Sequence, residues 1–271
     1  MTRLGSLTAD LKDRSVKPLV PFLTAGYPDE ETFLGVMAAA AEAGCRIVEV
    51  GIPFSDPVAD GPVIQASSQR ALEQGMTLTR TLELAGQVQA EHGLAVVLMG
   101  YLNPILHMGP EKFAAACRQA SVAGVIVPDL PLEESGGLRA LLLEADVDLI
   151  DLVAPTTGTD RLVDHTAAAG GFMYLVSTTG VTGSGVDAGD DLESYVARVR
   201  AANPLPLYVG FGISTPDDAV RVGSCADGAV VGSALIRTID EAADSAAAVT
   251  RARDFLSRMN NALNPEKGSS Q

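Results

Sequence analysis

Tryptophan is absent from this chain of 271 residues, and aromatic residues make up only 4% of it. So few aromatic side chains argue against a stacking platform for nucleic-acid bases. Basic residues are also scarce: 19 lysines and arginines stand against 34 aspartates and glutamates, a formal net charge of −15. That charge repels the phosphates of nucleic acids and of anionic membranes. We therefore expect neither a nucleic acid nor a membrane as a partner.

Cysteine is rare, and long hydrophobic runs are missing. The three cysteines lie far apart and show no CxxC spacing, which argues against a disulfide framework or a structural zinc site. No apolar stretch reaches the ~18 residues that a membrane span needs. Residues 1–17 carry charges where a secretory signal would be apolar. The simplest expectation is a cytoplasmic protein.

Short apolar runs alternate with longer amphipathic stretches along the chain. Runs rich in Val, Ile and Leu are typical of buried parallel strands. They predict eight strands, at Leu19–Thr24, Arg46–Gly51, Ala95–Gly100, Gly124–Val127, Asp148–Val153, Phe172–Val176, Leu207–Phe211 and Gly228–Val231. Helical patterns separate the strands, for example at Glu30–Ala43 and Pro110–Val122.

Eight βα units in one series predict an α/β fold, a (β/α)8 TIM barrel that occupies residues 1–271 as one domain. Two helical stretches, Gly61–Gln74 and Thr77–Glu91, fill the gap after the second strand and predict one extra helix there. Arg3–Lys12 predicts an extra N-terminal helix under the barrel, and residues 264–271 resemble a frayed tail. A doubly wound sheet is the alternative, but only one glycine follows the first strand, where that fold carries a glycine-rich turn.

A carboxylate lies inside the second apolar strand. Glu49 shares a strand face with Ile47 and Gly51, opposite Val48 and Val50. If that face points into the barrel mouth, burial raises the pKa of Glu49 and makes it a candidate acid or base. The alternative is a structural glutamate paired with an arginine of a covering helix.

The loop after this strand is long for a βα connection and carries two aspartates, Asp56 and Asp60. Asp60 is followed by Gly61 and Pro62, which is an ordinary helix start, so local sequence alone favours Asp60 as a helix cap. Asp56 before Pro57 is likewise an ordinary turn.

Segments that contain glycine follow three consecutive strands, within 177–185, at Gly210–Ser214 and at Gly232–Ala234. Glycines let backbone N–H groups approach an anion, and barrels bind phosphate on the loops after their last strands. Together the three segments predict a phosphate site, although each segment alone would more often be a plain turn.

Lysine and paired histidines are missing from the ends of the predicted strands, which argues against two classes of reaction. None of the four lysines follows a strand, which argues against a Schiff-base aldolase. The three histidines show no metal-ligand spacing, so we interpret His92, His107 and His165 as surface or capping groups. Acid–base chemistry by carboxylates on a phosphorylated small molecule remains.

Three parts of the sequence resemble the tryptophan synthase alpha chain family. Pro21–Pro28 reads PFLTAGYP, and Glu49–Gln65 reads EVGIPFSDPVADGPVIQ, which is similar to the family's long and specific motif. The glycine segments at 180–183, 210–213 and 232–234 are similar to its phosphate-site segments. The resemblance runs from about Leu7 to Leu256.

The resemblance implies a lyase that cleaves indole-3-glycerol phosphate to indole and glyceraldehyde 3-phosphate in tryptophan biosynthesis. It implies no cofactor and no metal in this chain, and a beta chain partner that holds pyridoxal phosphate, two of each chain forming the complex. Glu49 and Asp60 match the family's catalytic carboxylates, which overrides the local preference for Asp60 as a cap. Substrate-binding roles are implied for Phe22, Tyr174, Thr182, Gly183, Phe211, Gly212, Gly232 and Ser233.

Two other functions remain as alternatives. A non-catalytic subunit that only activates a partner is disfavoured by the presence of both carboxylates. Another phosphosugar-binding barrel, such as indole-glycerol-phosphate synthase or phosphoribosylanthranilate isomerase, is disfavoured by the residues at the strand ends. The long loop with prolines after the second strand leads us to expect the partner near Pro53 and Asp56. The glycines within 180–189 could act as hinges, so we expect a loop over 177–190 that closes on the substrate.

Overall fold

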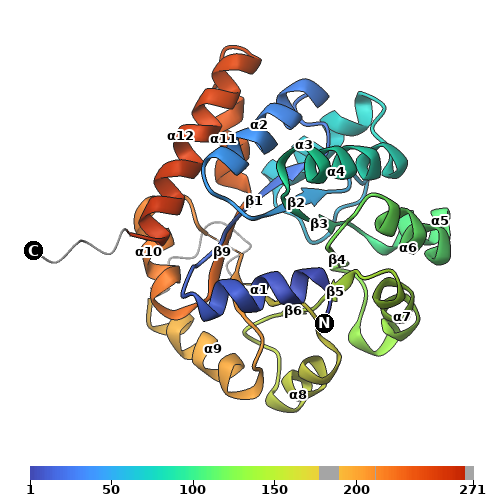
Figure 1. Cartoon of the computed structure of the whole chain (residues 1–271), viewed down its shortest axis with the longest axis vertical. Helices are drawn as coiled ribbons and strands as arrows, with labels where there is room; N and C mark the ends of the chain where they lie inside the picture. The colour runs from blue at the N-terminus through green and yellow to red at the C-terminus, as the bar shows by residue number, and fades with distance from the viewer. Residues whose placement is uncertain (177–188, 211, 266–271) are drawn as a thin grey trace, which may run out of the picture.

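Parallel strands alternate with helices along the chain and form a barrel with the helices outside (Figure 1). The computed structural model describes residues 1–176, 189–210 and 212–265. The strands are β1 (Leu19–Thr24), β2 (Ile47–Gly51), β3 (Ala95–Met99), β4 (Gly124–Ile126), β5 (Asp148–Ile150), β6 (Leu152–Val153), β7 (Met173–Leu175), β8 (Leu207–Val209) and β9 (Gly228–Val231). The helices are α1 (Arg3–Asp13), α2 (Glu30–Glu42), α3 (Pro62–Glu73), α4 (Leu78–His92), α5 (Leu102–Met108), α6 (Pro110–Gln119), η1 (Leu132–Glu134), α7 (Gly136–Glu144), α8 (Thr159–Ala168), α9 (Gly189–Ala202), α10 (Pro216–Cys225), α11 (Ser233–Asp240) and α12 (Ser245–Leu263).

The strands lie in the order β5-β4-β3-β2-β1-β9-β8-β7-β6, and hydrogen-bonded neighbours run parallel. β5 and β6 stand at the two ends of this order, yet only Asp151 separates them in the sequence. The stretch 148–153, expected as one strand, pairs with β4 through its first part and with β7 through its second. It thereby joins the two ends of the sheet, and the predicted TIM barrel is confirmed with its fifth strand divided in two.

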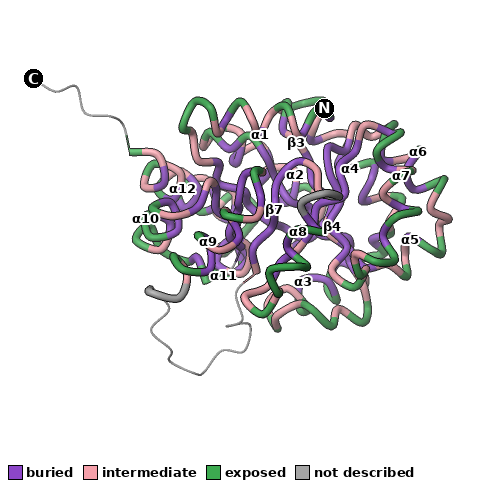
Figure 2. The backbone as a smooth tube through the Cα atoms, turned by 90° about the horizontal axis from the view of Figure 1, so that it is seen from below, coloured by how far each residue is buried: buried purple, intermediate pink, exposed green. Residues whose placement is uncertain are grey.

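Successive side chains of a strand point alternately into the barrel interior and toward the surrounding helices. Ile47 packs inside the barrel with Val20, whereas Val48 and Val50 pack between the strands and the helices. Figure 2 shows the buried residues gathered along the strands and the exposed residues on the outer helices. The expected alternation in β2 is therefore present, and Glu49 shares the inner face with Ile47.

The predicted extra helices are present. α1 lies across one end of the ring of strands (Figure 1), and its Leu4 and Leu11 pack with the barrel interior. The Thr2 hydroxyl at its start donates a hydrogen bond of 2.5 Å to the Asp148 carboxylate. α3 and α4 both lie between β2 and β3. α1 thus covers one end of the barrel and leaves the carboxyl ends of the strands for a site.

The last helix that the structure describes, α12, ends at Leu263. Most of the expected tail, residues 266–271, lies outside the described residues. None of the helices that the structure describes has both the length and the apolar character needed to cross a membrane. Cys45, Cys117 and Cys225 are all free thiols.

A buried ion pair lies where β5 passes into β6. Asp151 is only 7% exposed, and its Oδ1 lies 2.7 Å from Nη2 of Arg139 on α7. Nη1 of the same arginine donates to the Leu149 carbonyl at 2.9 Å. His165 is also buried, with Nδ1 at 3.8 Å from Asp151 Oδ1. The interpretation of His165 as a surface or capping group is therefore wrong, because α8 carries it inward over the divided strand.

Asp151→Ala is expected to lower the free energy of unfolding by about 3 kcal/mol, because it removes the carboxylate from a buried ion pair. Urea unfolding measures this loss. The matched control is Glu133→Ala, which removes an exposed partner 2.8 Å from Arg161 and should cost less than about 1 kcal/mol. Equal losses in both variants would contradict a stabilising role for the buried pair.

Candidate active site

A cavity of about 1490 Å³ opens at the carboxyl ends of the strands, the usual place of an active site in a barrel. Seven residues expected in the site line it: Phe22, Glu49, Asp60, Tyr174, Gly212, Gly232 and Ser233. The other three, Thr182, Gly183 and Phe211, lie outside the described residues, as does most of the expected loop 177–190. The fold therefore brings all the expected residues that it describes to one cavity.

Glu49 lies at the inner wall of this cavity, on β2 beside Phe22 of β1. Its side chain is 1% exposed, and its Oε1 has no hydrogen-bond partner within the described residues. Burial, followed by the negative charge of Asp60, raises the pKa of Glu49 from 4.5 to about 8. The carboxyl is therefore mainly protonated at neutral pH and can act as an acid.

Asp60 lies on the loop between β2 and α3. The cap of α3 is Gly61, which offers no side-chain hydrogen bond, so the local preference for Asp60 as a helix cap is wrong. Burial raises the pKa of Asp60 from 3.8 to about 6, while a hydrogen bond from Tyr101 lowers it. Asp60 is consequently ionised at neutral pH, and the cavity holds one neutral and one charged carboxyl group.

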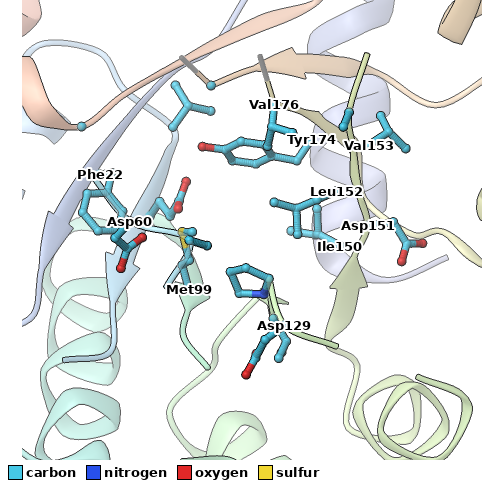
Figure 3. A pocket seen from close by; sticks show the side chains of 18 of the residues that line it. Phe22, Asp60, Met99, Asp129, Ile150, Asp151, Leu152, Val153, Tyr174 and Val176 are labelled. Atoms are coloured by element: carbon cyan, nitrogen blue, oxygen red, sulfur yellow. The ribbon is translucent and has the colours of Figure 1, made fainter. Parts of the chain in front are cut away.

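Tyr174 extends from β7 on another wall. Figure 3 shows its ring reaching over the cavity toward the side that carries Phe22 and Asp60. Burial, then Glu49 and then Asp60 raise the pKa of its hydroxyl. A Cβ at position 210 would lie 2.2 Å from that hydroxyl, so only glycine leaves room for the ring. Gly210, which the sequence offered as part of an anion loop, thus makes space for a side chain.

An apolar wall completes this part of the cavity, formed by Met99, Ile150, Leu152 and Val176 (Figure 3). Farther along, Gly212 has a φ of +68° and faces open space. Gly232 precedes α11, and neither it nor a neighbouring side chain caps the first amides of that helix. Amides at a helix start suit an anion. The cavity therefore offers an apolar wall and carboxyl groups at one place and anion-binding amides at another.

One residue of the site was not expected from the sequence. Tyr101 follows β3 directly and is 3% exposed, with its hydroxyl next to Asp60. Its position just beyond a strand end was the available signal. Nothing local indicated that its side chain would reach the loop after β2, because the contacts join residues about 40 positions apart.

Comparison with known proteins gives consistent matches. A sequence model of the family described as tryptophan synthase alpha chain matches residues 8–264. The tryptophan synthase alpha chain of Geobacter sp. (strain M21) is 46% identical over 241 residues, 89% of this chain and 90% of that protein. The one from Gluconobacter oxydans (strain 621H) is 44% identical over 252 residues, 93% of both chains. The crystal structure of the alpha chain from Legionella pneumophila subsp. pneumophila is similar with a TM-score of 0.90 and 34% identity over 99% of both chains.

Proposed function

This chain belongs to the tryptophan synthase alpha chain family and is a lyase that cleaves indole-3-glycerol phosphate in tryptophan biosynthesis, and we propose that Glu49 and Asp60 are its catalytic carboxylates. The proposal is carried by the placement of both carboxyl groups in one cavity, where Glu49 is 1% exposed and its Oε1 has no hydrogen-bond partner among the described residues. Their surroundings raise the pKa of Glu49 to about 8 and that of Asp60 only to about 6, so Glu49 keeps its proton more readily than Asp60. Separated pKa values of this kind assign an acid and a charge stabiliser.

In the proposed reaction Glu49 gives its proton to C3 of the indole ring. The ring nitrogen becomes positive, and the Asp60 carboxylate stabilises that charge through the N–H. The bond between C3 and the side chain then breaks, and its electron pair restores the aromatic ring. The hydroxyl on the departing carbon loses its proton to the Glu49 carboxylate, which forms the aldehyde of glyceraldehyde 3-phosphate and regenerates the acid.

Indole release from indole-3-glycerol phosphate by the purified chain, with and without a beta chain, tests this function. Release by the chain alone that a beta chain accelerates is the expected result. A chain that accelerates the beta chain's reaction but never releases indole would support the non-catalytic alternative.

We extend the proposal to substrate binding. The residues that the resemblance implies are Phe22, Tyr174, Thr182, Gly183, Phe211, Gly212, Gly232 and Ser233. The apolar wall suits the indole ring, and the amides near Gly212, Gly232 and Ser233 suit the phosphate. Thr182 would approach Asp60 when the loop over 177–190 closes.

Gly212→Val is expected to raise KM at least about tenfold with a smaller effect on kcat, because a branched residue strains a φ of +68° and displaces the amide that faces the phosphate. Steady-state kinetics measure the change. Gly75→Val is the control, since Gly75 has a φ of +85°, also faces open space and does not line the cavity. A KM unchanged in Gly212→Val, or raised equally in both, would contradict the phosphate assignment.

We propose that cleavage needs no metal and no organic cofactor in this chain. In the reaction above Glu49 carries out both proton transfers, and Asp60 stabilises the positive charge that forms between them. Full activity after dialysis against a chelator is the expected result. Loss of activity that a divalent ion restores would disprove this proposal.

Family membership implies a complex with a tryptophan synthase beta chain. We propose two copies of each chain and contact through the loop after β2. Pro53, expected at this contact, is buried, whereas Asp56 is exposed and Val58, which lines the cavity, is 84% exposed. Co-purification followed by mass determination tests the composition.

We also propose a cytoplasmic location, which cell fractionation tests.

A further inference from the structure

Tyr101 is in contact with three residues of the loop that carries Asp60. Its ring stacks on Phe54 with a centroid distance of 5.2 Å and an angle of 29° between the planes. Its hydroxyl oxygen accepts a hydrogen bond of 3.0 Å from the backbone N–H of Ala59. The same hydroxyl lies near the Asp60 carboxylate, and each of the two groups shifts the pKa of the other. One buried side chain from the end of β3 therefore holds both ends of the loop.

The hydrogen bond from Ala59 gives the Tyr101 hydroxyl a defined direction. A phenol has one proton to donate and can accept through its oxygen. The Ala59 N–H occupies the oxygen, so the single proton is left for the Asp60 carboxylate. A hydrogen bond of this kind favours the ionised carboxylate over the neutral acid. Burial and the charge of Asp60 raise the pKa of Tyr101, so the phenol keeps its proton.

Three other titratable groups lie near Tyr101 and Asp60, and none of the three takes the place of the Tyr101 hydroxyl beside Asp60. Asp129 accepts a hydrogen bond of 2.9 Å from the backbone N–H of Leu102 and acts on Tyr101 by its negative charge. Glu49 and Tyr174 share the cavity with Asp60, and Tyr174 has no charge to offer at neutral pH. Tyr101 is the donor that faces Asp60 among these groups.

We propose that Tyr101 is a positioning residue that fixes the Asp60 carboxylate at the cavity wall through its hydroxyl. The proposal rests on the proposed role of Asp60. The ring of Tyr101 holds the loop through its stacking on Phe54. The hydroxyl orients the Asp60 carboxylate and favours its ionised form. The substrate never has to touch Tyr101.

Tyr101→Phe separates these two parts, because it keeps the ring and its stacking on Phe54 and removes only the hydroxyl. We expect kcat for indole release to fall about tenfold or more, with KM within about twofold, since the variant cannot make the proposed charge-assisted hydrogen bond to Asp60. We also expect the acidic limb of the kcat/KM profile to move to higher pH, because Asp60 without its donor takes up a proton more readily.

The control is Tyr195→Phe, which removes another buried hydroxyl that donates a hydrogen bond of 2.6 Å to the Val153 carbonyl. It should change thermal stability similarly and leave the pH profile in place. A merely structural Tyr101 predicts the same behaviour for both variants. An unshifted acidic limb with unchanged kcat in Tyr101→Phe would overturn the proposal.

A measurement without turnover keeps the test independent of activity. The carboxyl carbon of Asp60, labelled with 13C and identified by its absence in Asp60→Asn, is titrated by NMR in the wild type and in Tyr101→Phe. An upward shift of the Asp60 midpoint supports the proposal, and an unchanged midpoint overturns it. If Asp60→Asn cleaves at the wild-type rate, the proposed function of Asp60 fails instead, and the NMR result still decides whether Tyr101 acts on it.

Discussion

Glu49→Gln is expected to slow indole release about 10²- to 10⁴-fold, the contribution of one general acid or base. Glutamine keeps the shape of the side chain, which is 1% exposed, but has no proton to give to the indole ring. KM should change much less than kcat, because the apolar wall and the phosphate amides are untouched. Single-turnover indole release measures the chemical step directly.

The same substitution, which lowers activity, should raise the free energy of unfolding. The pKa of Glu49 is about 8 in the fold and 4.5 without its surroundings. Below pH 4.5 the folded and unfolded states both hold the proton. Between pH 4.5 and 8 the unfolded state loses the proton and the folded state keeps it, so the wild type loses stability as pH rises through this window. The glutamine side chain does not titrate, so the Glu49→Gln variant should gain stability relative to the wild type between pH 5 and pH 8.

Urea unfolding of the wild type and of Glu49→Gln at pH 5 and at pH 8 tests the expected gain in stability, and indole release is measured on the same proteins. Glu144→Gln is the matched control, since Glu144 is exposed at the end of α7 and should affect neither cleavage nor stability. A Glu49→Gln variant that is less stable at both pH values and still cleaves at the wild-type rate would show that Glu49 is a structural partner.

The sequence alone predicted the barrel because its strands are buried on both sides. β1 and β9 lie where the apolar runs placed them, and the remaining strands begin or end within one or two residues of the expected bounds. The fifth strand is the exception. Asp151, which separates β5 from β6, pairs with Arg139 on α7, and no local sequence pattern predicts this tertiary ion pair.

The candidate site could be predicted only in part. The alternation of Ile47 and Glu49 in β2 predicted which face the carboxyl occupies, because strand periodicity is a local property. Local sequence misjudged Asp60, since a residue before a Gly-Pro helix start resembles a cap wherever its side chain points. It missed Tyr101, whose partners come from another βα loop. Periodicity thus placed the strand residue, whereas the loop residues depend on contacts between loops.

Asp60→Asn tests the second carboxylate with a nearly isosteric change. Asparagine keeps an oxygen for the indole N–H but has no charge to stabilise the positive ring, so kcat should fall about 10²- to 10³-fold, as for other lost electrostatic partners in a site. KM should rise less, because the charge matters most when the ring is protonated. Asp13→Asn, an exposed change at the end of α1, serves as the control.

The pH profile identifies Asp60 more sharply than the rate. In the wild type kcat/KM should fall below about pH 6, where Asp60 takes up a proton, and above about pH 8, where Glu49 loses one. These limbs belong to the interacting pair. Asp60→Asn should lose the acidic limb altogether. Its basic limb should move to lower pH, because the negative charge that helps Glu49 keep its proton is gone. An acidic limb that persists unchanged in this variant would exclude Asp60 as the ionised group that the reaction requires.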